Sequence, residues 1–136
     1  MSGQKREATG AQKPGVRILL IEDHDDTREI VANLLSRIGY DVKVAAGMLP
    51  ALDLIRSEKV DVILSDIGLP DGSGYELIKT AKAMQPEIKA VALTGLAAKE
   101  DLRLSREAGF DFHLTKPVDF HELRNVLSGA TVAEQA

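Results

Sequence analysis

Five short apolar segments alternate along this chain with five segments in which apolar residues recur at helical spacing. The apolar segments are residues 16–21, 41–45, 60–64, 88–93 and 110–115. Helical segments follow them; the first four end at Gly39, at Ser57, before Pro86 and at Gly109, and the last starts from Asp119 and frays from Ser128. Because strands and helices alternate in this way, the chain is expected to form a parallel sheet covered by helices on both faces.

The polarity of each apolar segment predicts its place in the sheet. Segments 16–21, 60–64 and 88–93 are rich in consecutive apolar residues, which is typical of strands buried on both faces. In 41–45 and 110–115 apolar and polar residues alternate, as expected for half-exposed edge strands. Three interior strands and two edges fit an α/β fold of the flavodoxin-like type, a three-layer (βα)5 sandwich with strand order 2-1-3-4-5.

The length of 136 residues fits one folded domain. We expect a disordered leader at residues 1–14, which are polar and lack periodicity, then a domain at residues 15–129 and a frayed tail at residues 130–136. No apolar run is long enough to cross a bilayer, and the first residues lack the apolar core of a signal peptide. We therefore expect a cytoplasmic protein without membrane insertion.

Composition excludes several classes of site. The chain has no cysteine, which excludes disulfides, thiolate metal sites and cysteine nucleophiles. Its net charge of -4, without a basic patch interleaved with aromatic residues, argues against direct nucleic-acid binding.

The stretch VDVILSDIGLPDGSG places one carboxylate, Asp66, at the carboxyl end of the third strand, before a turn. A single Asp there more often caps a loop than binds a ligand. However, Glu22 and Asp23 follow the first strand, which the expected order places beside the third. Three carboxylates in one crevice need a counter-ion, and for oxygen ligands the natural one is a hard divalent cation such as Mg²⁺.

Two further side chains are expected in this crevice. Thr94 follows the fourth strand and Lys116 follows the fifth. A hydroxyl and an ammonium group can each bind a phosphoryl oxygen, and an aspartate carboxylate can act as a phosphoryl nucleophile. Acids, hydroxyl and ammonium together fit a phosphoryl group better than a sugar or a nucleobase.

Over residues 16–127 the sequence resembles the receiver domain of two-component response regulators. The motifs that carry the resemblance are Glu22-Asp23 after LLI, Asp66 in SDIGLPDGSGYELI, Thr94-Gly95 after VAL, and Lys116-Pro117 after the aromatic-rich fifth strand. The stretches DIGLPDGSGYELI and AGFDFHLTKPVD are most similar to receivers attached to hybrid sensor histidine kinases. The resemblance implies a phosphoacceptor in a phosphorelay, which assists its own phosphorylation and dephosphorylation but is not otherwise an enzyme.

The resemblance also implies which residues bind the ion and the phosphate. Asp66 would accept the phosphoryl group from the phosphohistidine of a histidine kinase or a histidine phosphotransfer protein. Asp23, Asp66 and the backbone carbonyl of Gly68 would ligate Mg²⁺, with Glu22 acting mainly through water. Thr94 would contact the phosphoryl oxygens.

Around the fifth strand, the resemblance implies that Lys116 also contacts the phosphoryl oxygens and that the Lys116-Pro117 bond is cis. The switch position, usually Tyr or Phe in the family, is His113 here, and an imidazole enters a buried space cheaply only when it is neutral.

We expect the face made by the fourth helix, fifth strand and fifth helix to bind a downstream partner, with Leu102 as an exposed apolar contact.

Three other functions fit parts of the pattern. A phosphatase that forms an aspartyl phosphate usually has a second Asp two residues after the nucleophile, where this chain has Gly68. A flavodoxin-like cofactor binder would have Ser, Thr and Gly after the first strand, whereas the EDHDD run found there would repel a phosphate. An interaction module of the same fold that is never phosphorylated stays open as an alternative.

Overall fold

Five parallel strands form the central sheet, in the order β2-β1-β3-β6-β7. They are β1 (Arg17–Ile21), β2 (Asp41–Ala45), β3 (Val62–Asp66), β6 (Lys89–Thr94) and β7 (Phe112–Thr115). The computed structural model describes residues 15–95 and 99–132. The expected leader at residues 1–14 lies outside these ranges, as do residues 133–136 of the expected tail.

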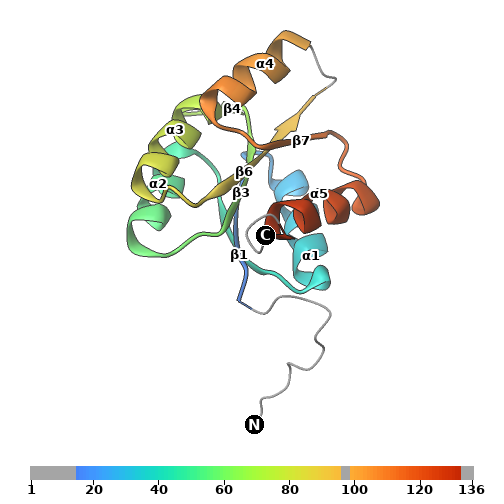
Figure 1. Cartoon of the computed structure of the whole chain (residues 1–136). Coiled ribbons are helices and arrows are strands. Elements are labelled where there is room, and N and C mark those ends of the chain that lie inside the picture. Colours follow the sequence, from blue (N-terminus) through green and yellow to red (C-terminus); the bar gives the residue numbers. More distant parts are fainter. Residues whose placement is uncertain (1–14, 96–98, 133–136) are drawn as a thin grey trace.

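Helices cover both faces of the sheet, as predicted. They are α1 (Asp25–Ile38), α2 (Met48–Ser57), α3 (Gly74–Met84), α4 (Lys99–Ala108) and α5 (Phe120–Val132). Figure 1 shows α1 and α5 on one side of the sheet and α2 and α3 on the other, with α4 next to α3. The predicted flavodoxin-like order is confirmed, because β6 and β7 are the fourth and fifth strands of the main sheet.

Residues with specific backbone preferences set several helix ends. Gly39 ends α1 in the left-handed region at φ 116°, and its N–H donates to the carbonyls of Leu35 and Ser36. The Ser73 hydroxyl accepts the backbone N–H of Glu76 and so caps α3, and the Asp119 carboxylate accepts the N–H of Glu122 at the start of α5.

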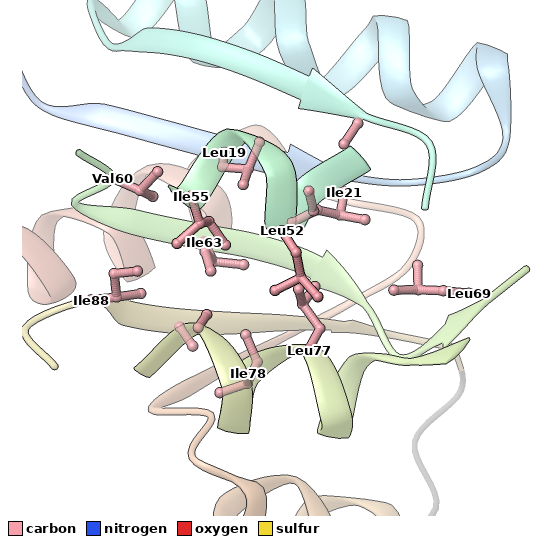
Figure 2. Close-up of a cluster of buried hydrophobic side chains, with 14 of the residues drawn as sticks. Leu19, Ile21, Leu52, Ile55, Val60, Ile63, Leu69, Leu77, Ile78 and Ile88 are labelled. Atoms are coloured by element: carbon pink, nitrogen blue, oxygen red, sulfur yellow. The ribbon is translucent and has the colours of Figure 1, made fainter. Parts of the chain in front are cut away.

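Two clusters of apolar side chains fill the space between the sheet and the helices. Alternate residues of β1 belong to different clusters, because successive side chains of a strand point to opposite faces. Leu19 and Ile21 pack with α2 and α3, whereas Ile18 and Leu20 pack with α1 and α5. Figure 2 shows the first cluster, in which β3 and both helices meet through Leu52, Ile55, Ile63, Leu77 and Ile78.

The turn after Asp66 is more ordered than the sequence indicated. It forms a two-stranded hairpin of β4 (Gly68–Leu69) and β5 (Gly72–Ser73). At the tip of this hairpin, the Asp71 carboxylate accepts the backbone N–H groups of Met48 (2.6 Å) and Leu49 (2.9 Å). The hairpin thus supplies the N-terminal cap of α2, whose own N-cap residue, Gly47, has no side chain.

The last helix is longer than predicted. The fraying expected from Ser128, and the domain end expected at residue 129, are wrong because α5 continues to Val132. Ala130 is fully buried in the cluster on the α1 and α5 side, and the Thr131 hydroxyl donates to the carbonyl of Leu127 (3.0 Å). Packing against the sheet therefore holds the last turn of the helix in place.

Within residues 15–95 and 99–132, no helix combines the length and apolar character needed to span a bilayer.

The start of α3 packs closely against the end of β3. A Cβ at Gly74 would lie 2.7 Å from the Asp66 carbonyl oxygen and 3.0 Å from the Ile67 Cα, both backbone atoms. We predict that Gly74→Ala lowers the free energy of unfolding by about 1–3 kcal/mol, although Gly→Ala within a helix is ordinarily stabilising. At Gly68 an added Cβ meets nothing within 4 Å, so Gly68→Ala is the matched control. Urea denaturation measures both, and unchanged stability of the Gly74 variant would contradict the prediction.

Candidate functional site

The predicted polar residues meet at the carboxyl edge of the sheet. Asp66 is the last residue of β3, and Glu22 and Asp23 directly follow β1, its neighbour. Thr94 is the last residue of β6, and Lys116 directly follows β7. Four neighbouring strand ends therefore supply the side chains of one crevice, as the strand order led us to expect.

Lys116 joins the two sides of this crevice. Its Nζ lies 2.9 Å from Oδ2 of Asp66 and 2.8 Å from Oε1 of Glu22. The backbone N–H of Lys116 donates to the carbonyl of Thr94 (2.7 Å), and the Lys116-Pro117 bond is cis, as expected. The ammonium group thus sits between two carboxylates from different strands.

Burial and charge act in opposite directions on these groups. Burial raises the pKa of Asp66 above its ordinary value, and the hydrogen bond from Lys116 offsets only part of this rise. Burial also raises the pKa of Glu22, but Lys116 and the N–H of His24 outweigh it, so this pKa is lowered overall. Burial lowers the pKa of Lys116, yet its bonds to both carboxylates raise it overall. The ammonium group of Lys116 is therefore stabilised in its charged form, whereas the ionised form of Asp66 is destabilised by burial.

The acidic side of the crevice has the donors of a divalent-cation site. Glu22, Asp23, His24 and Asp66 each bring one ligand atom into a group whose atoms all lie within 4.8 Å of one another. Carboxylate oxygens are the ligands that Mg²⁺ prefers. Gly68, whose carbonyl we expected to be a further ligand, lies two residues after Asp66 in β4.

Sequence reasoning did not place His24 in this group. Its ring Nδ1 lies 2.9 Å from Glu22 Oε2 and 3.4 Å from Asp23 Oδ1. The only hint in the sequence that His24 joins these acids is its position immediately after Glu22 and Asp23. That position does not predict the direction of the ring, because a side chain at a helix start can point in several directions.

Thr94 lies on the other side of the crevice. Its side chain is buried, and its hydroxyl donates to the carbonyl of Leu114 in β7 (3.4 Å). To contact a phosphoryl group on Asp66, this hydroxyl would have to leave that carbonyl.

Comparison with known proteins matches this arrangement to one family. The response regulator receiver domain pattern matches residues 18–128. The chain belongs to this family. The resemblance seen in the sequence is therefore confirmed, and the domain is a receiver of two-component systems.

Three relatives place this receiver among known proteins. The sensor histidine kinase RcsC of Salmonella typhi is 29% identical over 122 residues, which are 90% of this chain and only 13% of RcsC. A CheY-like receiver from Methanospirillum hungatei has a TM-score of 0.80 and is 32% identical in sequence. The match covers 88% of this chain and 96% of the Methanospirillum chain. The Ssk1 receiver of Saccharomyces cerevisiae, solved with the histidine phosphotransfer protein Ypd1, has a TM-score of 0.76 and is 25% identical in sequence. The match covers 82% of this chain and 85% of the Ssk1 chain.

His113, which we expected at the switch position, faces away from Phe112 and Leu114 as the alternation predicted. Its partner in the neighbouring strand is Ala92, which belongs to the cluster on the α2 and α3 side. Nε2 of the ring is shielded from solvent and has no hydrogen-bond partner in the described part of the chain. Burial lowers the pKa of His113, and the charge of Arg106 in α4 lowers it further.

The expected apolar contact on α4 of the receiver needs a correction. Leu102 is half-buried, whereas Leu104 is 49% exposed. The helix is rotated so that Ser105 and Ala108 are buried, and Leu104 therefore lies on the outer side. Leu104, not Leu102, is the exposed apolar side chain of this helix.

Asp66 should weaken the fold at neutral pH. Its pKa is raised in the folded state, so its ionised form is less stable there than in the unfolded chain. We predict that Asp66→Asn raises the free energy of unfolding at about pH 7, and that the gain shrinks below about pH 4, where wild-type Asp66 also becomes neutral. Denaturant unfolding at both pH values measures this. Asp53→Asn, at an exposed site on α2, is the control, and an Asp66→Asn protein that is less stable than wild type at pH 7 would refute the prediction.

His113 should make the receiver sensitive to mild acid. Its pKa is lowered in the folded state, so protons bind the unfolded chain more readily. Stability is therefore lost as the pH falls through the unfolded value of about 6.5. We predict that wild type loses more stability than His113→Phe between about pH 8 and about pH 5. Melting curves for both, with exposed His121→Phe as control, provide the measurement, and parallel pH profiles for wild type and the His113 variant would rule it out.

Proposed function

We propose that this receiver accepts a phosphoryl group on Asp66 from the phosphohistidine of a histidine kinase or a histidine phosphotransfer protein. The observation that carries the proposal is the contact of Lys116 Nζ with Asp66 Oδ2, at 2.9 Å, beside a cluster of acidic groups. An ammonium group held at the carboxylate can stabilise the charge of a transferred phosphoryl group.

The chemistry is a direct transfer. A carboxylate oxygen of Asp66 attacks phosphorus, the P–N bond to the donor imidazole breaks, and an acyl phosphate P–O bond forms while the imidazole leaves. Lys116 binds one phosphoryl oxygen, and Thr94 binds a second after its hydroxyl turns away from the Leu114 carbonyl. Catalysis by the domain is limited to its own phosphorylation and dephosphorylation.

Asp23, Asp66 and the Gly68 carbonyl would hold Mg²⁺, with Glu22 acting mainly through water. The ion, when bound, neutralises charge on the phosphoryl oxygens. Glu22 is fully buried and paired with Lys116, so it serves chiefly to fix the position of the ammonium group.

The comparisons support the phosphorelay setting. The Ssk1 receiver was crystallised with a histidine phosphotransfer protein, which makes that class of protein a suitable donor here. The chain spans about 13% of RcsC, a sensor histidine kinase, so attachment to a hybrid kinase is one setting that we propose. The setting that we propose is cytoplasmic.

The partner surface would be the face of α4, β7 and α5. Leu104 on α4 is exposed there, and the half-buried ring of His113 lies in the adjacent strand. Movement of the Thr94 hydroxyl toward Asp66 would free the Leu114 carbonyl in β7 and so change this face.

Phosphoryl labelling tests the proposal. We predict that acetyl phosphate, or a phosphorylated kinase, labels wild type only when Mg²⁺ is present, because the ion offsets the repulsion between the acids and the phosphate. Asp66→Asn should abolish the label, whereas Asp53→Asn should keep it. A phosphate-sensitive gel and intact-mass spectrometry give the measurement.

Equal labelling of wild type and the Asp66→Asn protein would exclude Asp66 as the acceptor. If wild type takes no label from any donor, the domain instead acts as an interaction module that is never phosphorylated.

A further inference from the structure

His24 occupies the N-cap position of α1 without capping the helix. N-cap residues usually have a side-chain oxygen that accepts a backbone N–H of the first turn. The His24 side chain makes no such bond. Instead its ring turns back toward the acids at the end of β1, where Nδ1 lies 2.9 Å from Glu22 Oε2.

A buried group fixes the position of this ring. Glu22 is fully buried, and its Oε2 faces both the backbone N–H of His24 (3.0 Å) and the ring. Arg28 in α1 holds the same segment, since its guanidinium donates to the Glu22 carbonyl (2.8 Å). The His24 side chain nevertheless is 71% exposed, so an ion in solution can reach it.

The ring lies among groups that bind divalent ions. One atom from each of His24, Glu22, Asp23 and Asp66 belongs to a set whose members all lie within 4.8 Å of one another. Oε1 of buried Glu22 points into the same crevice, where Lys116 Nζ lies 2.8 Å away but completes no hydrogen bond of good geometry. Mg²⁺ prefers oxygen ligands, whereas an imidazole among carboxylates suits ions such as Zn²⁺, Co²⁺ and Ni²⁺.

We propose that His24 is a metal ligand through which this crevice also binds a divalent transition ion such as Zn²⁺, held by its imidazole together with the carboxylates of Asp23 and Asp66. The inference rests on the proposed function only in placing the ion in the same acidic cluster. Mg²⁺ would leave the imidazole unused, and the transition ion would engage it. Zn²⁺ would then compete with Mg²⁺ for this receiver.

Calorimetric titration of Zn²⁺ and Mg²⁺ separately into wild type and variants tests the assignment. His24→Asn keeps a residue that is favourable at an N-cap, so α1 should still form. We expect this change to weaken Zn²⁺ binding by about tenfold or more and to alter Mg²⁺ binding by less than about twofold. The control is His121→Asn, which removes an exposed imidazole from α5 and should change neither affinity.

A nitrogen chemical-shift titration identifies the ligand directly. At about pH 8, Zn²⁺ should shift a ring nitrogen of His24 strongly, and Mg²⁺ should not. The inference is overturned if His24→Asn binds Zn²⁺ as wild type does, if His121→Asn loses as much affinity, or if the His24 ring does not shift. Loss of phosphoryl labelling with intact, His24-dependent Zn²⁺ binding would refute the proposed function and leave this inference standing.

Discussion

The ammonium group of Lys116 holds together two carboxylates that would otherwise repel each other. Glu22 follows β1 and Asp66 ends β3, so the ion pairs connect three parts of the chain that are far apart in sequence. A fully buried carboxylate such as Glu22 is strongly destabilising without a partner, so its burial depends on this Lys. These two ion pairs tie the ends of β1 and β3 to the end of β7.

Most of the fold was predictable because its signals are local. The alternation of Val42, Lys43 and Val44 indicated an edge strand, and the pair Ser73 and Glu76 indicated a helix start. The β4–β5 hairpin was missed, since strands of two residues have no periodicity and Asp71 is bonded to α2, more than twenty residues earlier in the chain. The end of α5 was misplaced because its last turn is held by packing against the sheet, which local preferences do not reveal.

The candidate site was predictable to the level of strand ends. The strand order alone brings Glu22, Asp23 and Asp66 together with Thr94 and Lys116, as the structure has them. The directions of side chains outside regular strands were not predictable. The ring of His24 points to the acids because of a bond to buried Glu22, and the exposure of Leu104 in place of Leu102 follows from the rotation of α4.

The close packing around Gly74 makes the two sides of the crevice mechanically unequal. Its N–H donates to the Ile67 carbonyl at 2.6 Å, and there is no room for a methyl group between α3 and the backbone of Asp66. The β4–β5 hairpin, which lies between Asp66 and Gly74, is tied to α2 through Asp71. The backbone of Asp66 therefore has little freedom to shift when the charge on its side chain changes. Any displacement falls on the opposite wall, where the Thr94 hydroxyl makes one long hydrogen bond and the Nε2 of His113 makes none within the described residues.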